Sequence, residues 1–428
     1  MLDIRFVRDN RKLVENNLKK KFMEDRVPLV SKLIANYERS LKIKQELDSL
    51  RHRRNEISEE INKLQKEKRD FSHKIKEVKE IPDKIKALEK EFEDLTKANR
   101  SLLMKVPNIM HKSVPIGKDA SQNKVVKKWG NVPKFKFPIK NHVELAENLG
   151  IVDFDASAET SGSGFYYLKN ELALLNQALL KFTVDYLLKK KYVYVEPPLM
   201  IRKKVAEAAE DFEAFQTKIY KVEGEDLYLI PTSEHAILGM LTNKTIPKEK
   251  LPLKVFSYSM CFRKEVGSHG INEKGLWRTH QFNKVEQFVF CMPEDSWKYY
   301  DELQRNSEEL YKKLKIPYRI FECCSGDLGD WKAKSSDLEA YRPTTGKYEE
   351  VGSLSNCTDF QARDLNIKCV DKKGEKRVLH TLNNTAIATS RAMVVLLENC
   401  QQKDGSIKIP TVLQKYMGGL KKIDSRTK

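Results

Sequence analysis

One stretch of this sequence, residues 262–282, reads FRKEVGSHGINEKGLWRTHQF. The segments that flank it, LPLKVFSYSMCF and HQFNKVEQFVFC, are rich in β-branched and aromatic residues and predict two strands. The loop between them is polar and contains glycines, with Arg263 and Glu265 at its start and Arg278 and Phe282 at its end. Period-two alternation predicts that Arg263 and Glu265 share one strand face. Such a unit is either an anion-binding hairpin or an ordinary charged hairpin.

Further helices and strands are expected on both sides of this hairpin. The segment 172–191, LALLNQALLKFTVDYLLKKK, predicts an amphipathic helix, and 192–201, YVYVEPPLMI, predicts a strand that ends at prolines. The stretch around KYEEVG predicts another strand, and 386–402, AIATSRAMVVLLENCQQ, predicts a helix. Strands in a row with few helices between them favour an antiparallel sheet. Neither GxGxxG nor GxxxxGK[ST] occurs, so a bound nucleotide would be held without a phosphate loop.

The N-terminal region has the heptad pattern of a helical hairpin. Steps of four and three residues keep a narrow apolar stripe on one side of each helix, as two-stranded packing requires. KEKRDFSHK (66–74) is the expected turn, and Pro82 is expected in the first turn of the second helix. The hairpin is either a dimerisation coiled coil or spacer, or a projecting arm that touches a partner. Its stripe consists of Ile43, Leu47, Leu50, Ile57, Ile61 and Leu64, followed by Ile81, Ile85, Leu88, Phe92, Leu95 and Leu102.

Composition limits the classes of partner and compartment. A length of 428 residues predicts two domains. The net charge of +18 predicts attraction to a polyanion such as RNA, DNA or an anionic membrane. The charge is densest in a proline- and glycine-punctuated connector, Lys118–Lys140, which touches phosphates or is a solvated linker. Seven cysteines without a CxxC pair predict reduced thiols, and their spacing gives no zinc site. The absence of a long apolar run or signal peptide predicts a cytoplasmic location and no membrane.

Several ordered motifs carry a family resemblance. The stretch 262–282 with its second strand resembles motif 2 of the class II aminoacyl-tRNA synthetases. LNNTAIATSRAMVVLLENCQ resembles motif 3, and the helix and strand that end at Pro197–Pro198 resemble motif 1, the dimer element. The combination is similar to the seryl-tRNA synthetases. That similarity rests on PTSE (231–234), KVEQ (284–287), GDLG (326–329), KYEEVGSLSNCTDFQAR (347–363) and LENCQQKDGSIKIP (397–410).

The resemblance implies an α+β protein. An N-terminal tRNA-binding domain (1–106) with an antiparallel coiled-coil arm would be followed by a basic linker (107–140). A class II catalytic domain (141–428), built on a mainly antiparallel β-sheet flanked by helices, would complete it. A homodimer of this kind would activate serine with ATP, release pyrophosphate and transfer serine to the 3′ end of tRNA(Ser). A selenocysteine-type tRNA, tRNA(Sec), remains open as a second substrate.

The chemistry explains why arginines and Mg²⁺ are expected. The carboxylate of serine, already ionised, attacks the α-phosphate of ATP, so the site must gather negative oxygens with guanidinium forks and a metal ion. By resemblance, Arg263 would hold the α-phosphate and the serine carboxylate. Glu265 would read the adenine amino group and Phe282 would stack on the base. Arg278 and Arg391 would bind the γ-phosphate, with Arg391 also covering the adenine.

The remaining site residues follow from the same resemblance. Glu350 and Ser353 would hold Mg²⁺, which favours oxygen ligands. Serine is small, so its recognition depends on hydrogen bonds to its hydroxyl and ammonium groups. Glu286 would accept from either group and Thr232 would contact the ammonium group. Asn383 and Thr385 would face the hydroxyl, although Asn383–Asn384 also fits a plain turn.

The arm and the loop supply the expected tRNA contacts. An RNA helix is read mainly through its backbone and shape, so basic side chains along the arm would neutralise phosphates. Arg54 interrupts the apolar stripe. It could instead pack its aliphatic stem against that stripe and extend its guanidinium group into solvent. The arm candidates are Arg51, Arg53, Arg54, Lys63, Lys66, Lys68 and Lys74, and the loop candidates at the acceptor end are His269, Asn272 and Lys274.

Two departures and two alternatives accompany this interpretation. Asp364 stands where the family usually has a second arginine after Arg363, and Gly352 lies in an otherwise hydroxyl-rich stretch. A ligase that loads a carrier protein would lack the tRNA arm. A non-catalytic RNA-binding paralogue would be expected to lose Arg263, Arg391 or Glu350, and this sequence keeps all three.

Overall fold

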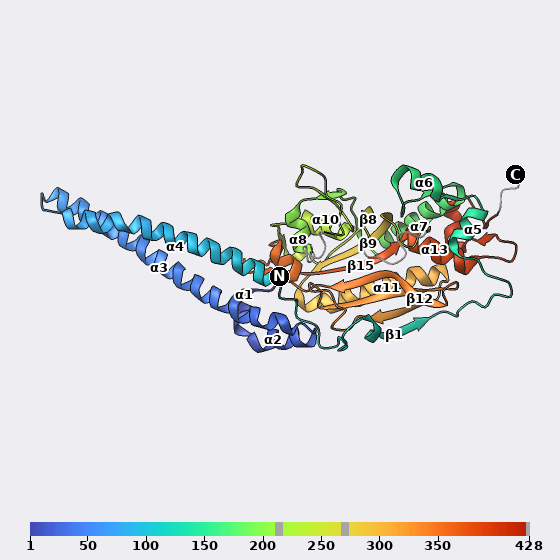
Figure 1. The fold of residues 1–428 in the computed structure, drawn as a ribbon, viewed down its shortest axis with the longest axis horizontal. Helices are drawn as coiled ribbons and strands as arrows, with labels where there is room; N and C mark the ends of the chain where they lie inside the picture. The colour runs from blue at the N-terminus through green and yellow to red at the C-terminus, as the bar shows by residue number, and fades with distance from the viewer. Residues whose placement is uncertain (210–216, 267–273, 425–428) are drawn as a thin grey trace. The chain divides into compact units, whose positions relative to one another are not determined.

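The structure, a computed structural model, describes residues 1–209, 217–266 and 274–424 (Figure 1). The chain divides into two compact units, Met1–Pro107 and Asn108–Lys428. The first unit is helical and the second is built around a large β-sheet. No helix in the described ranges is both long and apolar enough to cross a bilayer. All seven cysteines are free, and all except Cys400 are buried.

The first unit consists of two short helices and a long helical hairpin. Helices α1 (Ile4–Asp9) and α2 (Arg11–Lys20) precede α3 (Val27–Lys66) and α4 (Ser72–Met104), the two arms of the hairpin. The heptad prediction is confirmed, because Ile43, Leu47, Ile57, Ile81 and Ile85 are buried together along the seam. Val78 also packs there, while Leu64 and Leu102 lie outside this cluster.

Charged pairs join the two helices on either side of the apolar seam. Arg39 pairs with Glu91 at 2.8 Å, and Arg51 pairs with Glu89 at 2.9 Å. Nearer the turn, Arg53 lies 2.7 Å from Glu77 and Lys74 lies 2.5 Å from Glu60. Exposed pairs of this kind add little stability individually, but they fix which residues of α3 face which residues of α4.

The position predicted for Pro82 is wrong. Helix α4 begins at Ser72, so Pro82 lies inside the helix and not in its first turn. A proline removes one backbone hydrogen bond and crowds the preceding turn. The helix continues across it because Val78, Ile81 and Ile85, before and after the proline, all pack against α3.

The second unit contains an eight-stranded sheet with the order β1-β10-β11-β12-β15-β9-β8-β4. Every neighbouring pair is antiparallel except β4 with β8, which confirms the predicted sheet type. The strands are β1 (Lys124–Trp129), β10 (Tyr318–Glu322), β11 (Lys334–Arg342), β12 (Lys347–Asn356), β15 (His380–Ala388), β9 (Gln281–Cys291), β8 (Leu253–Phe262) and β4 (Val193–Tyr194). Strand β1 places part of the basic connector at one sheet edge.

Helices α7 (Asn170–Lys189), α11 (Ser296–Leu314) and α13 (Thr389–Cys400) pack against this sheet. The helix predicted over 386–402 therefore starts later than expected, because residues 386–388 complete strand β15. The strand predicted over 192–201 is shorter than expected and contributes Val193–Tyr194 to the sheet, since Pro197 and Pro198 cannot donate to a ladder.

Period-two alternation divides the central strands between two faces. On β15, Asn384 donates from Nδ2 to Leu303 O of α11 at 2.7 Å, so its side chain faces that helix. Its neighbours Asn383 and Thr385 line a cavity. Since successive side chains point to opposite sides of a strand, the cavity lies on the face away from α11. Asn383–Asn384 is therefore strand and not a turn.

Candidate active site

A cavity of about 450 Å³ lies over the centre of the sheet. It brings together all eleven residues predicted to bind ATP, Mg²⁺ or serine: Thr232, Arg263, Glu265, Arg278, Phe282, Glu286, Glu350, Ser353, Asn383, Thr385 and Arg391. These residues come from segments far apart in the sequence, and the strand order places them side by side. Residues that the sequence did not single out also line the cavity, among them Trp277, Lys284, Lys332 and Asp337.

The hairpin of β8 and β9 supplies Arg263 and Phe282. The guanidinium carbon of Arg263 lies 5.2 Å from the centre of the Phe282 ring, and its Nε donates to Pro231 O at 3.3 Å. The backbone N–H of Arg263 donates to His280 O at 2.9 Å, one hydrogen bond beyond the last paired residue of β8. An aromatic ring and a carbonyl therefore hold the guanidinium at the cavity wall.

The prediction that Arg263 and Glu265 share a strand face is wrong. Strand β8 ends at Phe262, and the N–H of Lys264 donates to Lys218 O at 2.8 Å instead of to β9. Glu265 then adopts a φ of +50°, outside the extended region. Both side chains still line the cavity, and Arg278 donates from Nη1 to Glu265 Oε2 at 3.3 Å.

Helix α13 and strand β12 form the opposite wall. Arg391, in the first turn of α13, donates from Nη1 to Glu350 O at 2.7 Å and lies 3.3 Å from Glu350 Oε2. Burial acts to raise the pKa of Glu350, but the charges of Arg391 and Arg263 outweigh it and the pKa is lowered. Glu350 is thus held as a carboxylate at the mouth of the cavity.

Asp337 is an acidic cavity residue that the sequence did not reveal. It pairs with Ser353 across β11 and β12, and Cys323 Sγ donates to its Oδ2 at 3.6 Å. Burial and the nearby charge of Glu350 raise the pKa of Asp337 to about 7. Only the strand register brings this carboxyl group beside Glu350 and Ser353, so no sequence motif marks it.

The part of the cavity around Glu286 contains a second unpredicted residue, Lys284. Its Nζ donates to Thr232 Oγ1 at 2.7 Å and lies 2.7 Å from Glu286 Oε2. Thr232 caps helix α10 (Ser233–Met240) by accepting from the N–H of Glu234 at 3.3 Å. Thr385 Oγ1 donates to Glu286 Oε2 at 3.0 Å. A buried cation thus arranges three of the predicted serine ligands.

Packing explains one of the two departures from the family pattern. A Cβ at Gly352 would lie 3.2 Å from Thr385 Cβ and 3.3 Å from Thr385 O, tighter than ordinary van der Waals contact. A hydroxyl-bearing residue there would push against a predicted serine ligand. Beside Asp364, Arg363 forms an ion pair with Asp359, the residue that precedes the short helix α12 (Phe360–Asp364). Nothing in the structure explains the change to Asp364.

The predicted tRNA contacts have different surroundings. Arg54 and Lys63 are exposed on α3, whereas Arg51 pairs with Glu89 across the hairpin. Lys274 Nζ lies 2.6 Å from Asp155 Oδ1 and 3.8 Å from Glu147 Oε1. His269 and Asn272 lie outside the described residues.

Comparisons with known proteins agree on the family. Residues 1–110 match the seryl-tRNA synthetase N-terminal domain, and residues 215–400 match the tRNA synthetase class II core domain (G, H, P, S and T). A serine–tRNA ligase from Methanospirillum hungatei is 46% identical over 419 residues, covering 97% of this chain and 99% of its own length. One from Pyrococcus horikoshii is 46% identical over 440 residues, covering 98% and 96%.

Solved structures extend this similarity to the whole fold. Seryl-tRNA synthetase from Pyrococcus horikoshii, complexed with ATP, superposes with a TM-score of 0.94 at 44% identity and covers 100% of both chains. Cytoplasmic serine–tRNA ligase from Naegleria fowleri, in complex with AMP, gives a TM-score of 0.89 at 32% identity and covers 100% of this chain and 99% of its own.

Replacing Lys284 tests the buried ion pair. Lys284 is 6% exposed and Glu286 is 2% exposed, so Lys284→Met leaves a buried carboxylate without its cation. We expect a loss of about 3–5 kcal/mol in unfolding free energy, measured by denaturant titration. The double variant Lys284→Met/Glu286→Gln should recover most of it. If Lys284→Met were as stable as the parent protein, a stabilising ion pair between Lys284 and Glu286 would be contradicted.

Proposed function

This chain belongs to the seryl-tRNA synthetases, ATP-dependent ligases that join serine to tRNA, and we propose which of its residues carry out each step. The observation that supports the proposal best is the meeting of Arg263, Arg278 and Arg391 in one cavity with the Phe282 ring. We assign the catalytic step to residues 141–428 and tRNA binding to residues 1–106. The linker 107–140 connects the two.

The nucleotide occupies the part of the cavity between Phe282 and Arg391. The adenine stacks on Phe282, and Glu265 accepts a hydrogen bond from its amino group. Arg263 binds the α-phosphate and the serine carboxylate together, because a planar guanidinium can donate to two oxygens at once. Arg278 and Arg391 bind the γ-phosphate. These donors neutralise charge where the new bond forms, and no general base is needed.

The oxygen-rich corner at Glu350 and Ser353 suits Mg²⁺. Its donor set is a carboxylate held ionised by Arg391 and Arg263 and a hydroxyl on the same strand, with the Asp337 carboxyl opposite. Hard oxygen donors are the ligands that Mg²⁺ takes in proteins, so Glu350 and Ser353 fit as ligands. Bound there, Mg²⁺ would neutralise phosphate charge in the transition state. Zinc is not expected.

Serine is recognised by hydrogen bonds around Glu286. Among the described residues, both polar contacts of the Glu286 side chain use Oε2, which leaves Oε1 for the ammonium or hydroxyl group of serine. Thr232 already accepts from Lys284, so an incoming ammonium group competes with Lys284 for that hydroxyl. Asn383 and Thr385 face the serine hydroxyl. A substrate without that hydroxyl leaves these buried polar groups unpaired.

The hairpin of α3 and α4 binds the RNA through its exposed cations. Arg54 and Lys63 are exposed on α3, whereas the ion pairs of Arg51, Arg53 and Lys74 hold the two helices in register. Contacts of this kind read the RNA backbone and its shape. Lys274, with His269, meets the acceptor end once its ion pair with Asp155 opens. Carrier-protein ligation, by contrast, gives the hairpin no role.

The protein acts as a homodimer in the cytoplasm. Val193 of β4 is 61% exposed, and Leu199, Met200 and Met260 are also exposed. Val193 belongs to the motif 1 region, Leu199 and Met200 directly follow it, and Met260 lies on the neighbouring strand β8. Large exposed apolar side chains that cluster favour burial by a partner. A second copy of the chain, paired through the motif 1 region, provides that partner.

Arg263→Ala tests the assignment of the catalytic step. Loss of the guanidinium removes the charge that stabilises the attacking carboxylate and the α-phosphate. We expect serine-dependent exchange of pyrophosphate into ATP to fall by about 10²–10³-fold or more, with unchanged thermal stability. Arg377→Ala is the matched control, because Arg377 is an exposed partner of Glu294. Normal exchange in Arg263→Ala would refute the role of Arg263.

Shortening the arm tests the assignment of tRNA binding. Arg51 and Glu89 face each other at 2.9 Å, so residues 52–88 can be replaced by a short glycine–serine turn without disturbing the base of the hairpin. We expect pyrophosphate exchange to stay within about twofold, while charging of tRNA(Ser) falls by about tenfold or more, because phosphate contacts are lost. An equal loss of both activities would contradict the assignment of catalysis to residues 141–428 and of tRNA binding to residues 1–106. Repeating the assay with tRNA(Sec) tests whether that tRNA is also a substrate.

A further inference from the structure

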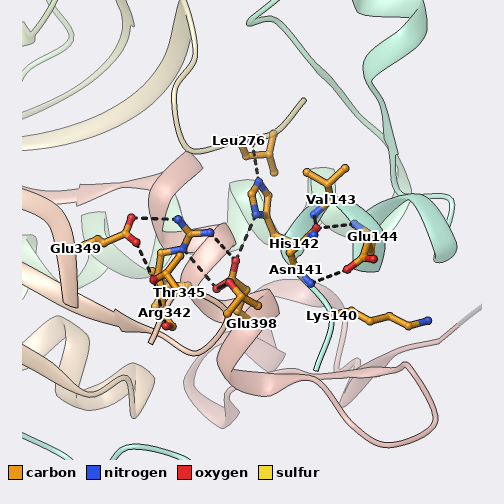
Figure 2. Close-up of polar contacts among 12 residues, drawn as sticks. Lys140, Asn141, His142, Val143, Glu144, Leu276, Arg342, Thr345, Glu349 and Glu398 are labelled. Atoms are coloured by element: carbon orange, nitrogen blue, oxygen red, sulfur yellow. Dashed lines mark hydrogen bonds and ion pairs between the residues drawn. The ribbon is translucent and has the colours of Figure 1, made fainter. Parts of the chain in front are cut away.

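A buried charge cluster, made of residues outside the lining of the cavity, contains no residue assigned a role above. Arg342, at the end of β11, donates from Nη2 to Glu398 Oε1 at 2.8 Å and from Nη1 to Glu349 Oε2 at 3.0 Å (Figure 2). Thr344 Oγ1 donates to Glu398 Oε2 at 2.7 Å. Arg342 is 8% exposed and Glu398 is fully buried. Such a pair is expensive to bury, so stability alone is a weak reason for it.

The cluster continues through His142 to the segment that leads from the motif 2 loop into β9 (Gln281–Cys291). His142 Nε2 accepts from the N–H of Leu276 at 3.1 Å, and its Nδ1 lies 3.4 Å from Glu398 Oε1 (Figure 2). Because Nε2 accepts, the proton of the neutral ring must be on Nδ1, where it points to Glu398. Burial acts to raise the pKa of Glu398, but hydrogen bonds from His142, Arg342 and Thr344 lower it to about 2.

Two local features fix this contact. Helix α5 (His142–Asn148) begins with a capping box, in which Asn141 Oδ1 accepts from the N–H groups of Val143 and Glu144 (Figure 2). His142 is thereby set at the first helical position. On the other side, Gly275 has a φ of +154°, and a Cβ there would lie 2.8 Å from His142 Nε2. Only glycine allows the backbone to approach the ring so closely.

Trp277, which follows Leu276 in the chain, lines the cavity. The guanidinium carbon of Arg342 lies 4.6 Å from the centre of the Trp277 ring, and that of Arg391 lies 5.3 Å from it. Tryptophan attracts cations more strongly than the other aromatic residues. The ring therefore contacts the buried cluster through Arg342 and the cavity through Arg391, and its backbone is anchored next to Leu276.

We propose that Trp277 is a positioning residue for the nucleotide. Arg342 and the Glu398–His142–Leu276 chain fix its ring, and the ring holds the Arg391 guanidinium where it meets ATP. Without the ring, Arg391 keeps Glu350 as a partner but loses the surface that defines its position over the cavity. The inference rests on the proposed role of Arg391. It predicts a defect in ATP binding and none in serine binding, because the proposed serine ligands Thr232, Glu286 and Thr385 are held by contacts with Lys284 and with one another.

Steady-state pyrophosphate exchange by the full-length protein tests this. In Trp277→Leu, the KM for ATP should rise by about tenfold, as expected from loss of a cation–π contact in a partly desolvated site. The KM for serine should change by less than about twofold. Trp277→Phe keeps a smaller aromatic face, so its KM for ATP should lie between those of the parent and the leucine variant. A purely structural role would not produce this order or this split between substrates.

Arg391→Ala separates the two proposals. If Arg391→Ala raises the KM for ATP but Trp277→Leu leaves it at the parent value, the role of Trp277 is refuted and that of Arg391 stands. If Arg391→Ala leaves it unchanged, the proposed role of Arg391 fails and the inference fails with it. Equal increases in both KM values in Trp277→Leu would also overturn the proposal. Should Trp277→Leu not fold, a parent-like KM for ATP in Trp277→Phe overturns it.

Discussion

Activation of serine by ATP brings several negatively charged groups together. The arrangement of the cavity depends on how the arginine side chains proposed to bind these groups are held in place. A serine carboxylate and a triphosphate repel each other, and in the proposed mechanism three guanidinium groups of one cavity neutralise them. Each has a fixed acceptor or aromatic partner. Arg263 has Pro231 O and Phe282, Arg278 has Glu265, and Arg391 has Glu350 and Trp277. These partners place the cations before any substrate arrives.

The antiparallel sheet makes this arrangement possible because its strands have two faces. Asn384 and Gln287 bond to α11 on one face, while their neighbours Asn383 and Glu286 line the cavity on the other. A register shift between β9 and β15 falls just after Thr385, beside the proposed serine ligands. Bulges of this kind often re-aim side chains at functional sites. Helix α11 thus stabilises the strands whose opposite faces carry the chemistry.

Local patterns in the sequence predicted the elements, and the register between distant strands supplied the rest. The heptads predicted the hairpin because a helix seam depends on residues only a few positions apart. The sequence did not mark three further residues of the cavity, because each depends on contacts with residues far along the chain. These are Lys284, Asp337 and Trp277. The strand face assigned to Glu265 was wrong for a related reason: β8 ends where Lys264 finds a backbone partner in another segment.

In the proposed mechanism, Arg263, Arg278, Arg391 and Phe282 define one site for serine and ATP together. A crystal structure with a non-hydrolysable seryl-adenylate analogue tests it most directly. We expect the adenine between Phe282 and Arg391, the phosphate mimic at Arg263, and the seryl ammonium group within hydrogen-bonding distance of Glu286. An analogue bound elsewhere, or one whose adenine lies away from Phe282, would contradict the account.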